Sequence, residues 1–151
     1  MTQYHFIASP KPLKIGAFGL NPISPDKPNV YATELDFAHL FMEKNYDEET
    51  KVTFSCSKHL KYKHQVAFMS NGIPLKGEKV NLNHPLAKKY MNILYSYILE
   101  AINDSGVIQY YTSINSEENL PLSSEREIRL VDLKIPEDLI LADRELVIIV
   151  A

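Results

Sequence analysis

Cysteine, tryptophan and glycine are scarce in this chain of 151 residues, which contains one Cys, no Trp and five Gly. The single cysteine, Cys56, cannot form an internal disulfide, which excludes the disulfide-stapled secreted class and favours a reducing compartment. The sequence also lacks the G-x-G-x-x-G, G-x-x-x-x-G-K, G-x-S-x-G and H-E-x-x-H patterns, each of which places a catalytic or phosphate-binding group. We therefore expect no cofactor and no metal, and an enzyme is the less favoured class.

Long hydrophobic runs are missing as well. The apolar stretch Leu146 to Ala151 is far shorter than the roughly 18 residues needed to cross a bilayer, and the N-terminus lacks the basic and then apolar pattern of a signal peptide. We expect a cytoplasmic protein without a membrane partner. With 45% hydrophobic and 23% charged residues, the chain has the composition of one globular domain over residues 1–151. Its content of Ile, Lys, Asn and Tyr suggests a bacterial source.

Charge is unevenly distributed along the chain, although the net value is only -3. Residues 51–90 contain eight Lys and one acid, residues 1–50 four Lys and seven acids, and residues 91–151 four bases and eleven acids. The sequence thus predicts a basic island between acidic flanks. Opposed charge blocks of this kind steer a complementary partner toward a protein. A head-to-tail homo-oligomer that pairs basic with acidic surfaces is an alternative.

Alternating apolar residues and runs of β-branched and aromatic residues predict several strands. The predicted strands are residues 3–8, 51–56, 65–70, 107–114, 126–133 and 146–150. The last of these is apolar at every position, which is typical of a strand near the sheet centre. Asn71 and Gly72 favour a hairpin turn into an irregular return strand over residues 73–82.

The clearest helix extends over residues 85–104. Apolar residues occupy about half of its circumference, Asn83 is placed to cap it, Pro85 fits its first turn and Gly106 fits the position just past its end. We expect this helix to pack on a sheet. The fold class is therefore α+β, with a mixed or antiparallel sheet on one long helix and a shorter N-terminal helix.

The N-terminal region has two interpretations. Residues 9–29 contain five of the nine prolines and are expected to be irregular surface chain. Residues 33–45 show helical spacing with Thr33 as a cap, and we expect the shorter helix there. The alternative is an extended strand over residues 30–41, in which alternate residues from Tyr31 to Phe41 share one face.

Two constellations would support an enzyme or metal protein. In a helix over residues 33–45, Asp36, His39 and Glu43 fall on one polar stripe, where carboxylates could orient an imidazole or share a metal with it. Cys56 with His59 could form a thiolate and imidazole pair. The simpler interpretations are a solvated helix face and a buried cysteine that acts as a small hydrophobe.

Binding residues fall into two groups. Lys58, Lys61, Tyr62 and Lys63 lie in the segment 58–64, where basic and aromatic side chains together suit a nucleic acid or a phosphorylated ligand. A second group consists of apolar side chains that the predicted fold does not use, namely Phe18, Tyr95 and Leu99.

These features favour a small protein-binding module, such as an inhibitor, an immunity-type factor or a regulatory subunit. Opposed charge blocks would guide the partner, and unused apolar side chains would anchor it. The alternatives are nucleic-acid or phosphorylated-ligand binding through the basic segment, and an enzyme or metal protein.

Overall fold

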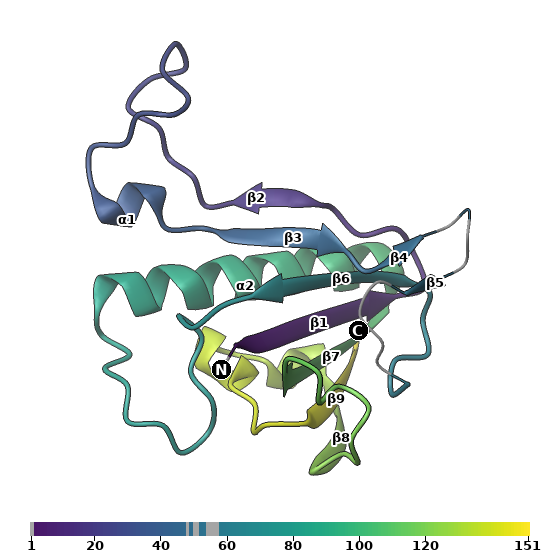
Figure 1. Cartoon of the computed structure of the whole chain (residues 1–151). Coiled ribbons are helices and arrows are strands. Elements are labelled where there is room, and N and C mark those ends of the chain that lie inside the picture. The colour runs from purple at the N-terminus through teal and green to yellow at the C-terminus, as the bar shows by residue number, and fades with distance from the viewer. Residues whose placement is uncertain (1, 48, 50–51, 54–57) are drawn as a thin grey trace.

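The computed structural model describes residues 2–47, 49, 52–53 and 58–151, and Figure 1 shows their arrangement. The strands are β1 Gln3–Ser9, β2 Gly16–Phe18, β3 Leu40–Lys44, β4 Tyr46–Asp47, β5 Val52–Thr53, β6 His64–Met69, β7 Val107–Ile114, β8 Ser124–Arg129 and β9 Glu145–Val150. The α-helices are α1 Glu34–Phe37 and α2 Pro85–Ser105, and two 3-10 turns follow β8, η1 Leu130–Asp132 and η2 Pro136–Leu139.

Seven strands form one mixed sheet in the order β2-β3-β6-β1-β7-β9-β8. All neighbours are antiparallel except β8 and β9, which run parallel. A separate pair, β4 and β5, lies outside it. The predicted α+β class with one long helix is confirmed, and the sheet is larger than the prediction implied.

The predicted helix over residues 33–45 is wrong beyond its first turn. Thr33 does cap α1, because its hydroxyl accepts a hydrogen bond from the Asp36 amide at 3.1 Å. The chain then leaves the helix at Ala38 and continues as β3. Ala38, Leu40 and Met42 are all buried, so packing of alternate residues into the sheet overrides the helical spacing.

The return strand predicted over residues 73–82 does not form. Strand β6 already has β3 on one edge and β1 on the other, so no edge is left for a hairpin partner. Instead Ile73 turns into the core and the Lys76 amide donates to the Leu141 carbonyl at 2.9 Å. Of the strand predicted over residues 51–56, only β5 lies within the described residues.

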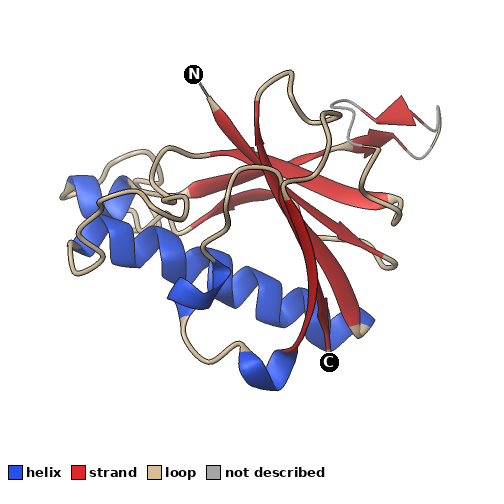
Figure 2. Ribbon diagram, turned by 90° about the horizontal axis from the view of Figure 1, so that it is seen from below, coloured by secondary structure: helices blue, strands red, loops and turns tan. Residues whose placement is uncertain are grey.

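Helix α2 covers one face of the sheet, called the helix side here, and Figure 2 shows the helices on that face. Its N-cap is His84 rather than Asn83, since His84 Nδ1 accepts a hydrogen bond from the Leu86 amide at 3.2 Å. Gly106 ends the helix with a φ of 80°, a conformation that favours glycine. No described helix has both the length and the apolar character needed to cross a bilayer.

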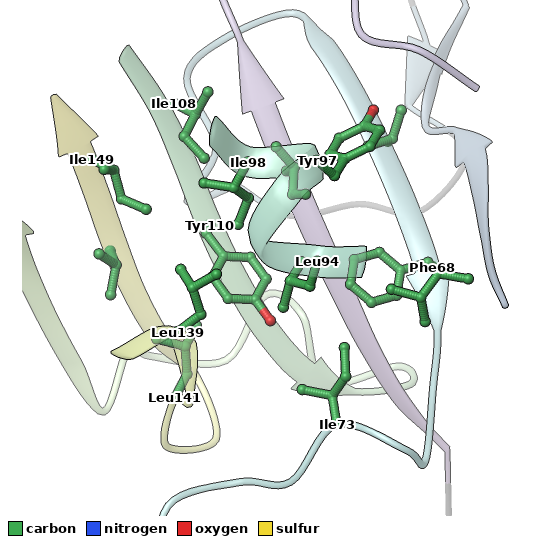
Figure 3. Close-up of a cluster of buried hydrophobic side chains, with 14 of the residues drawn as sticks. Phe68, Ile73, Leu94, Tyr97, Ile98, Ile108, Tyr110, Leu139, Leu141 and Ile149 are labelled. Atoms are coloured by element: carbon green, nitrogen blue, oxygen red, sulfur yellow. The ribbon is translucent and has the colours of Figure 1, made fainter. Parts of the chain in front are cut away.

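The main core lies between α2 and the strands, as Figure 3 shows. Leu94 and Ile98 from α2 meet Phe68 from β6 and Tyr110 from β7, all of them buried. Leu139, from η2, closes the side next to β9. Burial on this scale is the main favourable term for the fold.

A second, smaller cluster lies on the opposite face, called the loop side here. Successive side chains of β1 point to opposite faces of the sheet, so Ile7 lies on the helix side and Phe6 on the loop side. The buried members of this cluster are Phe6, Ala8, Leu60, Ala67, Tyr111 and Leu146. Leu60, Tyr62 and Leu122 cover it, so the described chain covers only this part of the loop side.

Candidate functional site

The basic segment is distributed over three different environments. The Lys58 amide donates to Asn119 Oδ1 and the Lys61 amide to Gln109 Oε1, both at 2.8 Å. Lys61 Nζ lies 5.2 Å from the centre of the Tyr62 ring, and Tyr62 packs against the loop-side cluster. Lys63 lines a small cavity. Lys58, Lys61 and Lys63 are all exposed and Tyr62 is half-buried, so binding of an anionic ligand by this segment stays a prediction.

His59, the predicted partner of Cys56, is held by the loop that follows β7. Its Nε2 is 2.8 Å from the Leu120 carbonyl and its ring centre is 5.5 Å from that of Tyr111. These contacts fasten residues 58–60 over the loop-side cluster. Cys56 itself lies outside the described residues.

The stripe of Asp36, His39 and Glu43 depended on a helix that does not form. Asp36 belongs to α1, where its carboxylate accepts hydrogen bonds from Asn21 and Thr33. His39 Nδ1 is 2.8 Å from the Phe37 carbonyl, and Glu43 lies on β3. Among the described residues, no group of three or more His, Asp or Glu side chains could hold a metal ion.

Phe18, Tyr95 and Leu99 are all partly buried. Phe18 packs edge-on against Tyr97, with ring centres 5.2 Å apart. The Tyr95 hydroxyl donates to the Leu133 carbonyl at 2.9 Å, and Leu99 is half-buried on α2. None of the three is among the strongly exposed apolar side chains.

One lysine of the basic island is neutralised in the fold. Lys76 Nζ lies 3.1 Å from Oε1 of Glu145, a carboxylate that is only 1% exposed and that also accepts from Arg126 Nε at 2.7 Å. Burial alone would raise the pKa of Glu145. The Ala142 amide and the two cations outweigh burial and hold that pKa below its usual value.

Three strongly exposed apolar side chains lie on α1, β3 and β6. Phe37 is 51% exposed, Phe41 52% and Met69 60%. Tyr31 packs edge-on against Phe37 with ring centres 5.1 Å apart, and Phe37 contacts the His39 ring at 5.2 Å. These five residues, Tyr31, Phe37, His39, Phe41 and Met69, are called the aromatic surface here.

Strand alternation explains why these residues share one face. Ala38, Leu40 and Met42 point to the helix side, so His39 and Phe41 point to the loop side. Glu43 of β3 pairs with Ala67 of β6, and the same antiparallel register extended by two residues places Phe41 level with Met69. Phe41 and Met69 therefore lie on two neighbouring strands, on a part of the loop side that no described segment covers, and the ring contacts of His39 and Phe37 continue the aromatic surface to Tyr31.

A projecting loop, residues 19–33, supports the far end of this surface and extends beyond the body in Figure 1. Two backbone hydrogen bonds hold its ends together. The Asn21 amide donates to the Asp36 carbonyl at 2.9 Å, and the Ile23 amide donates to the Val30 carbonyl at 2.8 Å. The Tyr31 hydroxyl donates to the Pro28 carbonyl at 3.0 Å. These bonds hold Tyr31 against Phe37 before any partner arrives.

A groove of about 790 Å³ lies on the helix side, between α2 and the N-terminal segment. Phe18, Leu35 and Ile93 supply its apolar lining. Gly19 permits this close approach, because a Cβ there would lie 2.4 Å from Ile93 Cδ1. Lys89 closes one end, where its Nζ contacts the Leu35 carbonyl.

Together these features define an α+β protein with a mixed sheet, one covering helix and an open aromatic surface. Comparison with protein-family models, with curated proteins and with solved structures found no match.

The sequence reasoning missed the aromatic surface. It assigned residues 33–45 to a helix, in which Phe41 belongs to the apolar face expected to pack on the protein rather than to an exposed sheet face. The alternative strand over residues 30–41 did indicate this surface, because its alternation places four of the residues on one face, namely Tyr31, Phe37, His39 and Phe41.

Proposed function

We propose that this protein binds another protein through the aromatic surface. The observation that supports it is the exposure of Phe41 and Met69 on neighbouring strands of one sheet face, next to the exposed Phe37 of α1. Aromatic residues and Met are enriched in protein interfaces, and adjacent large apolar side chains are uncommon on surfaces that contact only water. Phe41, which lies between His39 along the chain and Met69 on the next strand, is the expected anchor.

The surface is suited to binding because it is organised in advance. Tyr31, Phe37 and His39 already contact one another, and the projecting loop is closed by its own hydrogen bonds. Binding therefore needs little additional ordering of side chains, and ordering is one of the main costs of association.

Charges at the margin indicate the kind of partner. Glu34 lies one helical turn before Phe37, and Glu43 lies two residues after Phe41 on the same face of β3, with both carboxylates exposed. An acidic margin favours a partner whose apolar cleft is bordered by Lys or Arg. It opposes pairing of two copies of this surface, so the expected partner is a different protein with a basic margin.

Inhibitor, immunity-type factor and regulatory subunit are all roles that use such a surface, and the choice among them stays a prediction. The cytoplasmic location and the bacterial source are likewise predictions from composition.

Site-specific photo-crosslinking in the native cell tests the proposal. A photoreactive phenylalanine analogue in place of Phe41 should give a discrete adduct whose yield falls as the salt concentration rises. The control is the same analogue at Val131, which is 65% exposed in η1 but lies outside the aromatic surface. No adduct at Phe41, or the same adduct pattern at both positions, would overturn the proposal.

A further inference from the structure

Strand β8, at one end of the sheet, has an open edge. It pairs with β9 on one side, and no other described strand pairs with it on the opposite side. Figure 1 shows β8 at the margin of the molecule, at the other end of the sheet from β2. Among the described residues, 124–129 make no backbone hydrogen bond outside the strand pairs. Alternate N–H and C=O groups of an edge strand point outward, so β8 can still pair with another strand.

The loop-side face of β8 carries charges of both signs. Ile128 packs against the main core and therefore lies on the helix side. Alternation then places Glu125, Glu127 and Arg129 on the loop side, and all three are exposed. None of the three forms an ion pair with a described residue. An edge of uniform charge would repel a second copy, whereas an edge of mixed charge can attract one in a matching register.

Two copies of β8 can pair in antiparallel orientation about a two-fold axis that stands perpendicular to the sheet. Such an axis keeps the faces of the two sheets aligned, so loop-side residues lie opposite loop-side residues. The residue at the axis lies opposite its own copy, and the residues on either side of it exchange partners. The order of charges around each possible centre therefore decides which register is favourable.

Only one centre within β8 brings opposite charges together without opposing like charges. With Ile128 at the axis, Glu127 lies opposite Arg129 of the second copy, and the symmetry repeats this pair. A centre on any of the four charged residues of β8 brings that residue against its own copy. A centre on Ser124 places no opposite charges together. The sequence of β8 is therefore complementary to itself about Ile128.

We propose that two copies of this protein form a two-fold dimer in which their β8 strands pair antiparallel with Ile128 at the axis. The two ion pairs between Glu127 and Arg129 set the register. Backbone hydrogen bonds along the joined edges and contact between the two Ile128 side chains stabilise it further. Both copies use the same strand, so the interface closes on itself and does not continue into a fibre.

The dimer leaves the aromatic surface free. Three strands, β1, β7 and β9, lie between β6 and β8. Because the axis keeps the faces aligned, both aromatic surfaces lie on the same side of the joined sheet. A partner with two equivalent sites would be held by both at once, which raises the overall affinity without a new type of contact. This consequence rests on the proposed function, whereas the dimer itself does not.

Sedimentation velocity over a range of protein concentrations tests the dimer, with a thiol reductant present so that a disulfide through Cys56 cannot join two copies. The parent should dimerise reversibly. Glu127→Arg should weaken dimerisation at least about tenfold, because two opposite-charge pairs become two like-charge pairs. Arg129→Glu should do the same. The double variant Glu127→Arg/Arg129→Glu should restore the dimer, since it exchanges the two charges and keeps the pairs complementary.

The matched control is Glu125→Arg, which makes the same change of charge at an exposed residue on the same face of β8. In the register centred on Ile128, Glu125 has no residue of β8 directly opposite, so this variant should weaken dimerisation far less than Glu127→Arg. All of these side chains are exposed, so the variants should fold, and an unchanged circular dichroism spectrum would show that they do. A parent that stays monomeric at every concentration, a double variant that does not restore the dimer, or an equal loss in Glu125→Arg would overturn the proposal.

Discussion

The two parts of the loop side share the same sheet and the same alternating pattern, yet only one is covered. Phe6 on β1 is 0% exposed, because Leu60 and Leu122 pack over its cluster. Phe41 on β3 points to the same side and is 52% exposed. The covering chain is held in place by hydrogen bonds from Lys58 and His59 to the loop after β7. Among the described residues, no comparable segment packs over Phe41.

This difference separates apolar residues that build the fold from those available to a partner. A residue under covering chain contributes to the free energy of unfolding by being removed from water. An exposed residue in the same type of strand contributes little to the free energy of unfolding, so the presence of a large apolar side chain there is not explained by stability. Substitutions in the two parts should therefore have different effects on the same measurement.

The largest expected effect comes from the matched pair Phe6→Ala and Phe41→Ala. Removing the buried ring of Phe6 should lower the free energy of unfolding by about 3–5 kcal/mol, since it leaves a cavity. Removing the ring of Phe41 should change it by less than about 0.5 kcal/mol. Urea denaturation followed by circular dichroism measures both. Equal losses would mean that Phe41 is covered and that the aromatic surface is not open.

The pH dependence of stability is the next largest effect, and it comes from His5 on the helix side. Its ring stacks on Phe68 with centres 4.8 Å apart, and its Nδ1 lies 3.0 Å from the Tyr110 hydroxyl. Burial lowers the pKa of His5 from 6.5 to about 3, and the backbone of Ser70 offsets part of this shift. The buried Nε2 atom of His5 has no hydrogen bond of good geometry.

The His5 imidazole takes up a proton near pH 6.5 in the unfolded chain but stays neutral in the folded chain until the pH approaches 3. The free energy of unfolding therefore falls as the pH decreases from about 6.5 toward 3. About 2 kcal/mol should be lost between pH 7.5 and pH 5. His5→Phe keeps a ring against Phe68 and should remove most of this loss. His39→Gln, which removes a histidine of the aromatic surface, should retain it. The same slope in His5→Phe as in the parent would contradict the assignment.

A smaller effect is expected from Glu145, which Arg126, Lys76 and the Ala142 amide stabilise as a carboxylate. Glu145→Gln should cost about 1–2 kcal/mol, because both cations are partly exposed and regain water. The lowered pKa means that the contribution of the carboxylate is present above about pH 4.5 and is lost as the pH falls further. Acid unfolding curves test this, and an unchanged curve below pH 4.5 would contradict it.

Much of the sheet and the long helix could be predicted from the sequence. Helix α2 follows from its broad apolar face, Pro85 and Gly106, and β1, β6 and β7 follow from alternation or β-branched content. Helix α2 buries the apolar face that its pattern predicts, and β1 and β7 are buried on both faces. Local periodicity and tertiary packing agree on where these elements lie, so the sequence is sufficient to predict them.

The aromatic surface could not be derived in the same way, because two periods fit the residues around it. Leu35 and Ala38 fit a helix, while Ala38, Leu40 and Met42 fit a strand. The strand forms because residues 40–44 pair as β3 with the edge of β6 that β1 leaves open. A local sequence pattern does not report pairing between strands that are distant in the sequence. Nor does it report that other segments cover Phe6 and leave Phe41 exposed.

The smallest effect on stability, and the sharpest test of the open surface, concerns its acidic margin. If Glu34 and Glu43 oppose self-association, the double variant Glu34→Gln/Glu43→Gln should leave the free energy of unfolding within about 0.5 kcal/mol of the parent, because both side chains are exposed. It should nevertheless associate beyond the dimer formed through β8 at high protein concentration, since the apolar side chains are no longer surrounded by like charge. Sedimentation velocity measures this, with Glu78→Gln/Asp104→Asn as a control that changes the net charge equally at exposed sites away from the surface. Association beyond this dimer in both variants would attribute it to net charge alone, and its absence from both would show that the margin does not keep the aromatic surfaces of two copies apart.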